Sequence, residues 1–368
     1  MSRVETRPDE ELFRRPSDWE RLAKMRRAYL EVDAQPWADE RDLALYHASF
    51  GERIRWKWNA VFAEPALRGL APVPGHVVDF GCGSGVASLA LIASGLAPQP
   101  ADVHLVDASI LARRFAARRL VEAGANVLAG GTPPAGPIGT LVASHVLTEL
   151  GRSDENAFVA LAARAQRVFI VEPGTRAVAQ AVVALRERLR NEAGLTPLAP
   201  CPHAGVCGLA GAARRTLAAD SKDSANSAGG VAEANDAQAI DAWCHHFATP
   251  APEAFTSRFW REFGERLGID LRALPMSFLV LERNAVNISA LPNESEGEFV
   301  RILGRPRWEK GRSRFDLCHA GGVHAADMLK RTSPDLHRSL KEPEESVQLH
   351  RATLREQPDG SRRIESLH

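Results

Sequence analysis

The chain has 368 residues, and its 46 lysines and arginines balance its 46 aspartates and glutamates. This length allows one large domain or two modest ones, and zero net charge excludes a whole-molecule attraction to nucleic acid or membranes, so any such attraction must be local. The first residues are charged and lack the apolar stretch of a secretory signal, and the longest apolar runs are too short to cross a bilayer. We therefore expect a cytoplasmic protein with no membrane partner.

Residues 1–70 are predicted to form a helical region, because large apolar side chains recur there at spacings of three and four. One run comprises Trp19, Leu22, Met25, Tyr29 and Leu30, and a second comprises Leu43, Tyr46, Phe50, Ile54, Trp58 and Phe62. We expect this region to cap either the edge of the sheet that follows or the mouth of its ligand site.

A glycine-rich turn at residues 81–85 lies between a β-branched run at 77–80 and a segment at 86–96 that favours a helix. Glycine suits such a turn because it accepts positive φ and lets a ligand approach the backbone amides at the helix start. The pattern D-x-G-x-G-x-G differs from the G-x-G-x-x-G of most dinucleotide-binding folds. Its candidate cofactor-binding residues are Asp79, Gly81, Gly83 and Gly85.

A second predicted strand, residues 103–106, ends in Asp107 about twenty residues later. In a doubly wound sheet, a carboxylate at this place can accept hydrogen bonds from both ribose hydroxyls of a nucleoside cofactor. The glycine turn and Asp107 together resemble the S-adenosylmethionine (SAM) site of class I methyltransferases. We therefore expect that Rossmann-like α/β fold, with a dinucleotide-binding or nucleotide-free sheet as the alternative.

Residues 140–150 are predicted to be a strand that runs into a turn. In open parallel sheets, ligands bind outside the carboxyl ends of the strands, so Ser144 and His145 would face the transferred methyl group. His145 could act as a base, contact the substrate or merely hold its own loop. Ser144, His145 and Glu149 are the candidate catalytic residues, and the acceptor chemistry is left open.

The predicted methyltransferase-like domain spans residues 71–283 and continues the alternation of strand and helix. Residues 209–240 interrupt it with many small and polar side chains, and such a tract buries too little apolar surface to offset its ordering entropy. We expect a mobile insertion there. The remaining predicted elements are strands at 167–171 and 277–282 and helices at 176–193 and 253–267.

A polar linker leads to a small β-rich module predicted at residues 297–330, and a polar, loosely ordered tail is predicted at 331–368. The module carries the dense basic stretch of the chain: Arg301, Arg305, Arg307, Lys310, Arg312 and Arg314. Its positive charge makes it a candidate phosphate-contacting surface. The alternative is a charged hairpin that resists edge-to-edge pairing.

Five cysteines in a chain expected in the cytoplasm argue against a disulfide framework. Cys82 lies in the glycine turn. Cys201 and Cys207 share one proline-bracketed loop, and Cys244 and Cys318 follow far along the chain. The last four could converge on one site, where spacing alone suits zinc or an iron–sulfur cluster equally, and neighbouring histidines also allow a mixed zinc site.

Pro200-Cys201-Pro202 also resembles, superficially, the Pro-Cys nucleophile of RNA cytosine-5 methyltransferases, in which a thiolate adds to the base. That cysteine should follow the fourth strand of the sheet. Cys201 instead lies beyond the predicted fifth strand and a long helix, so this position disfavours a nucleophilic role.

Seven segments together resemble the methyltransferase-like family associated with the small ribosomal subunit, whose members occur in mitochondria and bacteria. They are Asp79–Gly85, Leu105–Ser109, Ser144–Leu150, Val171–Thr175, Ala199–His203, Trp243–His245 and Arg301–Pro306. The resemblance covers about residues 40 to 320. It implies a SAM-binding fold, a [4Fe-4S] cluster held by Cys201, Cys207, Cys244 and Cys318, and association with small-subunit ribosomal RNA during assembly or translation.

Two functions of different classes stay open on this basis. The first is a SAM-dependent methyltransferase that modifies small-subunit ribosomal RNA. The second is a non-catalytic assembly factor that binds the same RNA through the same fold. A further alternative is a small-molecule methyltransferase with a structural zinc site.

Overall fold

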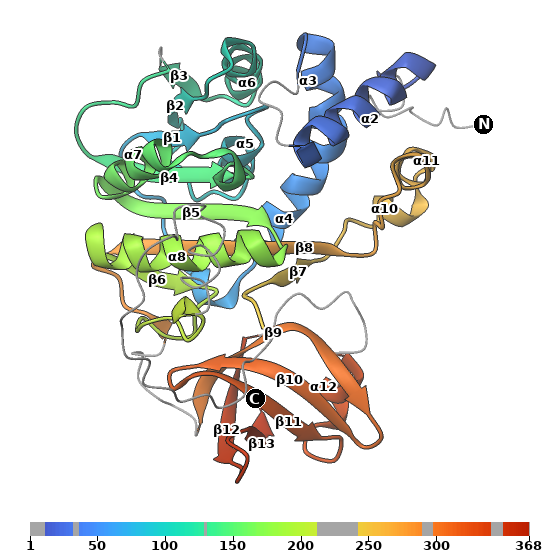
Figure 1. Ribbon diagram of the computed structural model, residues 1–368. Coiled ribbons are helices and arrows are strands. Elements are labelled where there is room, and N and C mark those ends of the chain that lie inside the picture. The colour runs from blue at the N-terminus through green and yellow to red at the C-terminus, as the bar shows by residue number, and fades with distance from the viewer. Residues whose placement is uncertain are drawn as a thin grey trace, which may run out of the picture. The chain divides into compact units, whose positions relative to one another are not determined.

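The computed structural model describes residues 12–31, 37–128, 131–211, 242–288, 297–339 and 349–367 (Figure 1). The chain divides into two compact units. The first unit comprises residues 1–62, 70–161 and 248–274, and the second comprises 63–69, 162–247 and 275–368. Among the described helices, none has the length and apolar character that a membrane-spanning helix requires.

The first unit opens with the helices that the spacing of its apolar residues predicts. They are α2 (Pro16–Glu31), α3 (Glu40–Tyr46), the π-helical turn η1 (His47–Gly51) and α4 (Glu52–Phe62). Arg21 joins the first two helices through hydrogen bonds of 2.8 Å to Asp39 and 2.7 Å to Asp42. Asp39 also caps α3, because its side chain accepts a hydrogen bond from the Asp42 amide.

A parallel sheet of order β3-β2-β1-β4 forms the centre of the first unit. Its strands are β1 (Val77–Phe80), β2 (Asp102–Val106), β3 (Asn126–Leu128) and β4 (Ile138–Ser144). Val77 of β1 faces Val103 on one side and Thr140 on the other. Helices connect and flank these strands: α5 (Val86–Ala93), α6 (Ile110–Glu122), the 3-10 turn η3 (Leu147–Glu149), α7 (Arg152–Ala162), α10 (Glu253–Thr256) and α11 (Arg258–Leu267).

The second unit contains strands of order β5-β8-β6. They are β5 (Ala165–Pro173), β8 (Leu274–Arg283) and β6 (Leu195–Ala199), beside the short strand β7 (His246–Ala248). Strand β8 is antiparallel to both neighbours, with Phe169 opposite Val280 and Leu195 opposite Arg283. The long helix α8 (Arg176–Glu192) and the 3-10 turn η2 (Pro65–Leu67) belong to the same unit.

Taken in succession, these two strand orders are those of the class I methyltransferase sheet. The strands of the first unit run parallel, and the second unit supplies the one reversed strand, β8, between its neighbours. Ligands in such sheets bind at the carboxyl ends of the parallel strands, where the order reverses on either side of β1. The predicted α/β fold class, with N-terminal helices and a C-terminal β module, is confirmed.

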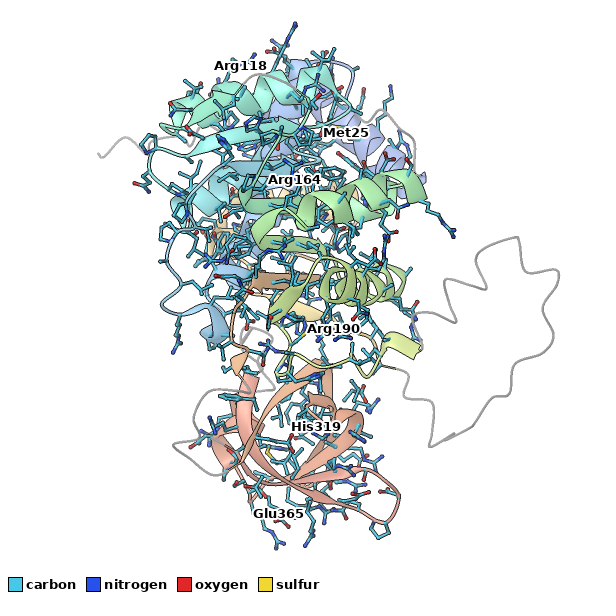
Figure 2. All side chains as sticks on the ribbon, turned by 90° about the vertical axis from the view of Figure 1, so that its left-hand side faces the viewer. Met25, Arg118, Arg164, Arg190, His319 and Glu365 are labelled. Atoms are coloured by element: carbon cyan, nitrogen blue, oxygen red, sulfur yellow. The ribbon has the colours of Figure 1, made fainter. Side chains whose placement is uncertain are left out.

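That β module is a closed five-stranded barrel of order β10-β11-β13-β12-β9. Its elements are β9 (Glu298–Glu309), β10 (Arg312–His319), β11 (Gly322–Leu329), α12 (Pro334–Ser339), β12 (Leu349–Glu356) and β13 (Arg362–Leu367). Val300, Phe315, Ala326 and Ile364 are among the buried residues of its core. Glu365, the neighbour of Ile364, is exposed on the outside of the barrel (Figure 2).

The expected polar tail at residues 331–368 is therefore corrected, because β12 and β13 complete the barrel. Alternation explains the error: one side chain in two faces the interior, so a strand needs few apolar residues, and here Ala352 and Ile364 supply them. Most of the insertion predicted at 209–240 lies outside the described residues, whereas Leu209 and Ala210 are buried. The other predicted domain boundaries stay predictions.

Candidate functional sites

The glycine turn after β1 requires glycine for two independent reasons. Gly81, Gly83 and Gly85 have φ values of 70°, 49° and 80°, a region that side chains disfavour. A Cβ added to Gly81 would also lie 2.5 Å from Cγ2 of Val146. The turn is fastened to the end of β2, because the amide of Gly81 donates a hydrogen bond of 2.7 Å to the carbonyl of Val106.

A pocket with about 770 Å³ of empty space opens over this turn in the first unit. Six predicted site residues line the pocket: Gly81, Gly83, Asp107, Ser144, His145 and Glu149. The carboxyl ends of β1, β2 and β4 thus meet at one site, as the parallel arrangement predicts.

Asp107 is oriented by two backbone amides. Its Oδ2 accepts a hydrogen bond of 2.9 Å from the Gly83 amide, and its Oδ1 accepts one of 2.8 Å from the Ser109 amide. Partial burial raises the pKa of this carboxyl, and the two amides oppose that rise. A carboxylate has about four acceptor positions, so two can serve these amides and two can serve a pair of hydroxyls.

Asp79, also predicted to bind the cofactor, does not line the pocket. It is fully buried, and its Oδ2 accepts hydrogen bonds from Ser88, at 2.7 Å from the hydroxyl and 3.3 Å from the amide. Burial raises the pKa of Asp79 to about 6. Asp79 therefore holds the first turn of α5 behind the glycine turn, and Gly85 contributes there as the residue that precedes the helix.

Aromatic residues of the N-terminal helical region form another wall of the cofactor pocket. Tyr29, Trp37 and Tyr46 line it, with ring centroids 5.7 Å apart for Tyr29 and Tyr46 and 5.5 Å apart for Trp37 and Tyr46. Burial raises the pKa of both tyrosines, so both hydroxyls stay protonated at neutral pH. The predicted helical cap lies at the ligand site, but periodicity did not identify these side chains as a binding wall.

The candidate catalytic residues at the end of β4 are held by consecutive residues of α4. Trp58 Nε1 donates a hydrogen bond of 3.0 Å to Ser144 Oγ, and Lys57 Nζ lies 3.3 Å from His145 Nε2. Burial, followed by the charge of Lys57, lowers the pKa of His145 well below its usual value. Because an ammonium group only donates, Nε2 of this neutral imidazole accepts, and the ring proton is assigned to Nδ1.

Two further features describe this end of the pocket. His145 has a φ of 54°, which is uncommon for a residue with a side chain and often accompanies a functional constraint. Glu149 lies exposed at the rim, where desolvation and then the charge of Asp107 raise the pKa of its carboxyl. The site therefore offers a hydroxyl, a neutral imidazole whose accepting nitrogen faces Lys57, and a carboxyl at the rim.

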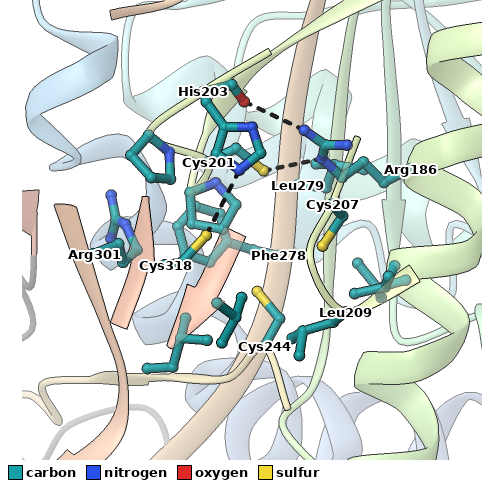
Figure 3. Close-up of a pocket in the computed structure, with 16 residues that line it drawn as sticks. Arg186, Cys201, His203, Cys207, Leu209, Cys244, Phe278, Leu279, Arg301 and Cys318 are labelled. Atoms are coloured by element: carbon teal, nitrogen blue, oxygen red, sulfur yellow. Dashed lines mark hydrogen bonds between the residues drawn. The ribbon is translucent and has the colours of Figure 1, made fainter. Parts of the chain in front are cut away.

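The four later cysteines line a single pocket in the second unit (Figure 3). Cys201 and Cys207 lie in the loop that follows β6, Cys244 precedes β7, and Cys318 lies on β10. Figure 3 shows their sulfur atoms around the same space, beside Arg186 of α8. The predicted convergence of four distant cysteines is thus present in this structure as a shared pocket with about 480 Å³ of empty space.

Nitrogen atoms contact three of these sulfurs. Arg186 Nε donates a hydrogen bond of 3.1 Å to Cys201 Sγ. His203 Nε2 lies 3.8 Å from Cys318 Sγ, and His246 Nε2 lies 3.6 Å from Cys244 Sγ. Hydrogen bonds to sulfur of this kind stabilise thiolates and tune the metal that they hold. Sequence reasoning missed Arg186, since an arginine on an amphipathic helix carries no local sign of such a role.

Burial has the opposite effect on the thiols. It raises the pKa of Cys207 to about 11 and raises the pKa values of Cys244 and Cys318 as well. These side chains are therefore protonated at neutral pH when no metal is bound, and metal binding would release their protons. A metal or cluster that binds here must therefore supply enough free energy to deprotonate several buried thiols together.

The arrangement of the four cysteines bears on what their pocket could hold. Across the described parts of the chain, no three His, Cys, Asp or Glu side chains converge as the ligands of one metal ion would. In a four-iron cluster each thiolate binds a different iron, so the four sulfurs need to surround a shared space rather than one point. The four cysteines here line one pocket.

The position of Arg301 contradicts part of the predicted basic surface. Its side chain is 1% exposed and lines the cysteine pocket, where its Nη2 lies 2.6 Å from Glu64 Oε2, a carboxylate that is itself 4% exposed. Arg301 lies between Val300 and Ile302 of the barrel core and so faces away from that core, into the cysteine pocket, where it is not available to phosphates in solution. Arg307, Arg312 and Arg314 lie further along the hairpin and are considered below, and Arg305 stacks its guanidinium over the ring of Phe247.

The strand order and the pocket at the ends of β1, β2 and β4 define the fold of a class I SAM-dependent methyltransferase. Residues 60–217 match the family described as Mitochondrial small ribosomal subunit Rsm22. This match confirms the resemblance predicted from the sequence, to a methyltransferase-like family associated with the small ribosomal subunit. No curated protein matches the chain.

Solved structures with some similarity include three methyltransferases. Magnesium protoporphyrin IX methyltransferase (ChlM) from Synechocystis PCC 6803 with bound SAH is 14% identical, with a TM-score of 0.35 over 75% of this chain and 100% of that chain. A SAM dependent methyltransferase from Aquifex aeolicus is 15% identical, with a TM-score of 0.32 over 44% and 90%. The 16S rRNA methylase RmtB is 20% identical, with a TM-score of 0.29 over 46% and 66%. At these scores the similarities carry no argument, and the fold class rests on the strand order.

Proposed function

We propose that this protein is a SAM-dependent methyltransferase that acts on small-subunit ribosomal RNA during ribosome assembly or translation. The observation that carries the proposal is the placement of Asp107, the glycine turn and the end of β4 around one open pocket. The match of residues 60–217 to a small-subunit family supports the ribosomal partner. The cytoplasm, as expected from the sequence, is the compartment that we propose.

In this proposal the residues mainly position the reactants. Asp107 holds the ribose, the glycine turn admits the cofactor to its backbone, and the wall of Tyr29, Trp37 and Tyr46 excludes water from it. Methyl transfer needs a nucleophile in line with the sulfonium, and alignment alone can supply a large part of the rate. Ser144 and His145 stand at the end of the pocket where an acceptor would enter.

We also propose that Cys201, Cys207, Cys244 and Cys318 hold a [4Fe-4S] cluster, with zinc as the alternative. When bound, the cluster would supply a covalent link between segments that are distant in the sequence, together with a redox-active centre. Arg186 would stabilise the ligand thiolate of Cys201 through its Nε hydrogen bond. No step of methyl transfer is assigned to this group.

The test uses the purified full chain, SAM labelled in its methyl group, and small ribosomal subunits isolated at successive stages of assembly. Asp107→Ala should weaken SAM binding in calorimetry by at least about tenfold, the value of one lost charge-assisted pair of hydrogen bonds. Asp102→Ala is the matched control, because Asp102 lies on the same strand and pairs with Asn126 outside the pocket. Label in the RNA that depends on Asp107 would support the proposal.

A second function is favoured by one specific observation. The accepting nitrogen of His145 faces Lys57, so the imidazole is not free to remove a proton from an acceptor. A non-catalytic assembly factor needs SAM and RNA binding but no base. Tight SAM binding with no label transferred to any subunit precursor would favour this function, and label transferred to small molecules alone would favour a metabolite methyltransferase.

A further inference from the structure

The order of the strands in the C-terminal barrel is informative by itself. Counted from β9, the strands close in the order 1-2-3-5-4-1, and α12 lies between the third and the fourth. The third and fifth strands, β11 and β13, pair in parallel, whereas the other pairs are antiparallel. This is the topology of the OB-fold, whose second and third strands and adjacent loops commonly bind oligonucleotides.

A row of charged side chains crosses the outside of this barrel. Arg307 of β9 pairs in register with Arg314 of β10, Arg314 pairs with Asp327 of β11, and Asp327 pairs with Arg363 of β13. The neighbouring residue Phe315 is buried in the core, so the alternation of the strand turns this row outward. Three arginines thus lie on four adjacent strands at one level of the barrel.

A groove with about 1,120 Å³ of empty space, open to solvent, runs along this row. Its lining includes Arg307, Arg312, Arg314, Phe315, Ala325, Ala326, Asp327, Gln357, Pro358, Asp359, Ser361 and Arg363. Residues 357–361 form the loop between β12 and β13, and residues 310–311 form the turn between β9 and β10. These are the two loops that flank the binding face of an OB-fold. The four arginines exceed the two aspartates of the lining, which leaves a formal charge of +2.

Among the four groove arginines, Arg363 is held by two hydrogen bonds to the largely buried Asp327, whereas the other three have more exposed side chains in their ion pairs. Arg307 pairs with Asp316 at 3.3 Å, and Arg312 and Arg314 both pair with Glu309. Their side chains are 63%, 36% and 46% exposed, respectively. Exposed pairs of this kind contribute about 0–1 kcal/mol, whereas a guanidinium can bind a phosphate through two parallel hydrogen bonds. A chain of phosphates can therefore replace them.

We propose that this groove binds single-stranded nucleic acid, with the phosphates on Arg307 and Arg314. The site is separate from the cofactor pocket, and only the identity of the strand as ribosomal RNA rests on the proposed function. A single strand fits better than a duplex because OB-folds follow single backbones with a basic groove.

The test measures fluorescence anisotropy of the full chain with a labelled, unstructured 12-nucleotide RNA and with the corresponding 12-base-pair duplex. The double variant Arg307→Gln/Arg314→Gln should bind the single strand at least about tenfold more weakly. Its plot of log affinity against log salt should be shallower by about 1.4, since each phosphate contact to a single strand contributes about 0.7. The matched control is Arg188→Gln/Arg272→Gln, which removes two charges from arginines that pair with Glu192 and Asp270.

The outcomes separate this inference from the methyltransferase proposal. Loss of single-strand binding in the groove variant, with SAM affinity unchanged and the control variant normal, supports the groove. Equal binding by both double variants, or a preference for the duplex, overturns it. If instead the groove variant loses a small-subunit protein but no oligonucleotide, the surface serves a protein partner and the inference is wrong. SAM binding and label transfer are measured independently, so either proposal can fail alone.

Discussion

The cofactor pocket and the cysteine pocket are built in different ways. The cofactor pocket is shaped mainly by the backbone. Three glycines with positive φ form the turn, and the amides of Gly83 and Ser109 orient Asp107. In the cysteine pocket, side chains from separate segments meet. Cys201 and Cys318 are more than a hundred residues apart, yet they line the same space.

The two pockets also differ in how they treat charge. Burial raises the pKa of the carboxyls in and behind the cofactor pocket, and backbone amides, the Ser88 hydroxyl and the charge of Arg113 oppose the rise at Asp79 and Asp107. The cysteine pocket instead contains two buried guanidinium groups, Arg186 and Arg301, each paired with a glutamate. A pocket organised by its backbone can remain formed without its ligand, whereas buried thiols and ion pairs depend more on what they hold.

The largest effect is expected from the cysteine pocket. Cys201→Ser or Cys244→Ser should abolish bound iron in anaerobically purified protein, because a ligand to the cluster is lost. The melting temperature should fall as well, since binding links distant segments and so contributes to folding. Iron, sulfide and zinc analysis with visible absorption checks the first result, and a thermal melt checks the second.

Cys82→Ser provides the control for that experiment, because Cys82 is buried at the cofactor pocket instead. This variant should retain its full iron content. Stoichiometric zinc without iron in the wild-type protein would withdraw the cluster while leaving the SAM fold in place. Iron retained in Cys201→Ser or Cys244→Ser would remove that cysteine from the ligand set.

The next effect concerns the ion pair between Glu64 and Arg301. Arg301→Met leaves the buried carboxylate of Glu64 without its partner, and breaking such a pair typically costs about 3–5 kcal/mol. Urea unfolding should show this loss. The double variant Glu64→Leu/Arg301→Met should recover most of it, because both charges are then removed from the interior.

Recovery in the double variant distinguishes two roles of Arg301. If the double variant is stable but loses iron, the arginine serves the cysteine pocket as well as the ion pair. If Arg301→Met unfolds as the wild-type protein does, the pair does not stabilise this unit. In neither case should single-strand RNA binding change, since Arg301 is buried away from the outer row of the barrel.

The contrast between the two pockets also explains which features of the fold and the sites the sequence predicts. The glycine turn, Asp107 and the end of β4 were predicted because each occupies a fixed place in a repeated strand and helix unit. The buried aspartate behind the turn was misassigned to the cofactor, since the motif does not reveal that Ser88 takes its carboxylate. A local pattern shows where a ligand binds more reliably than which side chain touches it.

The barrel marks the limit of such patterns. Strands β12 and β13 are polar, and only their pairing with β9 and β11 shows that they complete a barrel. Because of this pairing, the arginines of the basic stretch fall into two groups. Arg301 is buried, whereas Arg307 and Arg314 lie in one row on the outside of the barrel. The register of strand pairing, which cannot be seen in the sequence, decides which arginine can contact a phosphate.

The smallest expected effect concerns Asp79, which lies behind the glycine turn of the cofactor pocket. Its pKa is raised from 3.8 to about 6 in the folded protein, so folding favours the protonated form. A group with a raised pKa contributes stability that is present below the unfolded value and is lost as pH rises through the folded value. The contribution of Asp79 should therefore fall by at most about 3 kcal/mol between pH 4 and pH 7.

Asp79→Asn isolates that contribution, because the amide keeps an oxygen that can accept from Ser88 but does not titrate. The difference in unfolding free energy between the two proteins, measured with urea at each pH, should decrease from pH 4 to pH 7 and then level. Ser88→Ala should move the decrease to higher pH, since its hydroxyl lowers the pKa of Asp79. A difference that is flat across this range would mean that Asp79 is solvated, and that the turn is held by its glycines alone.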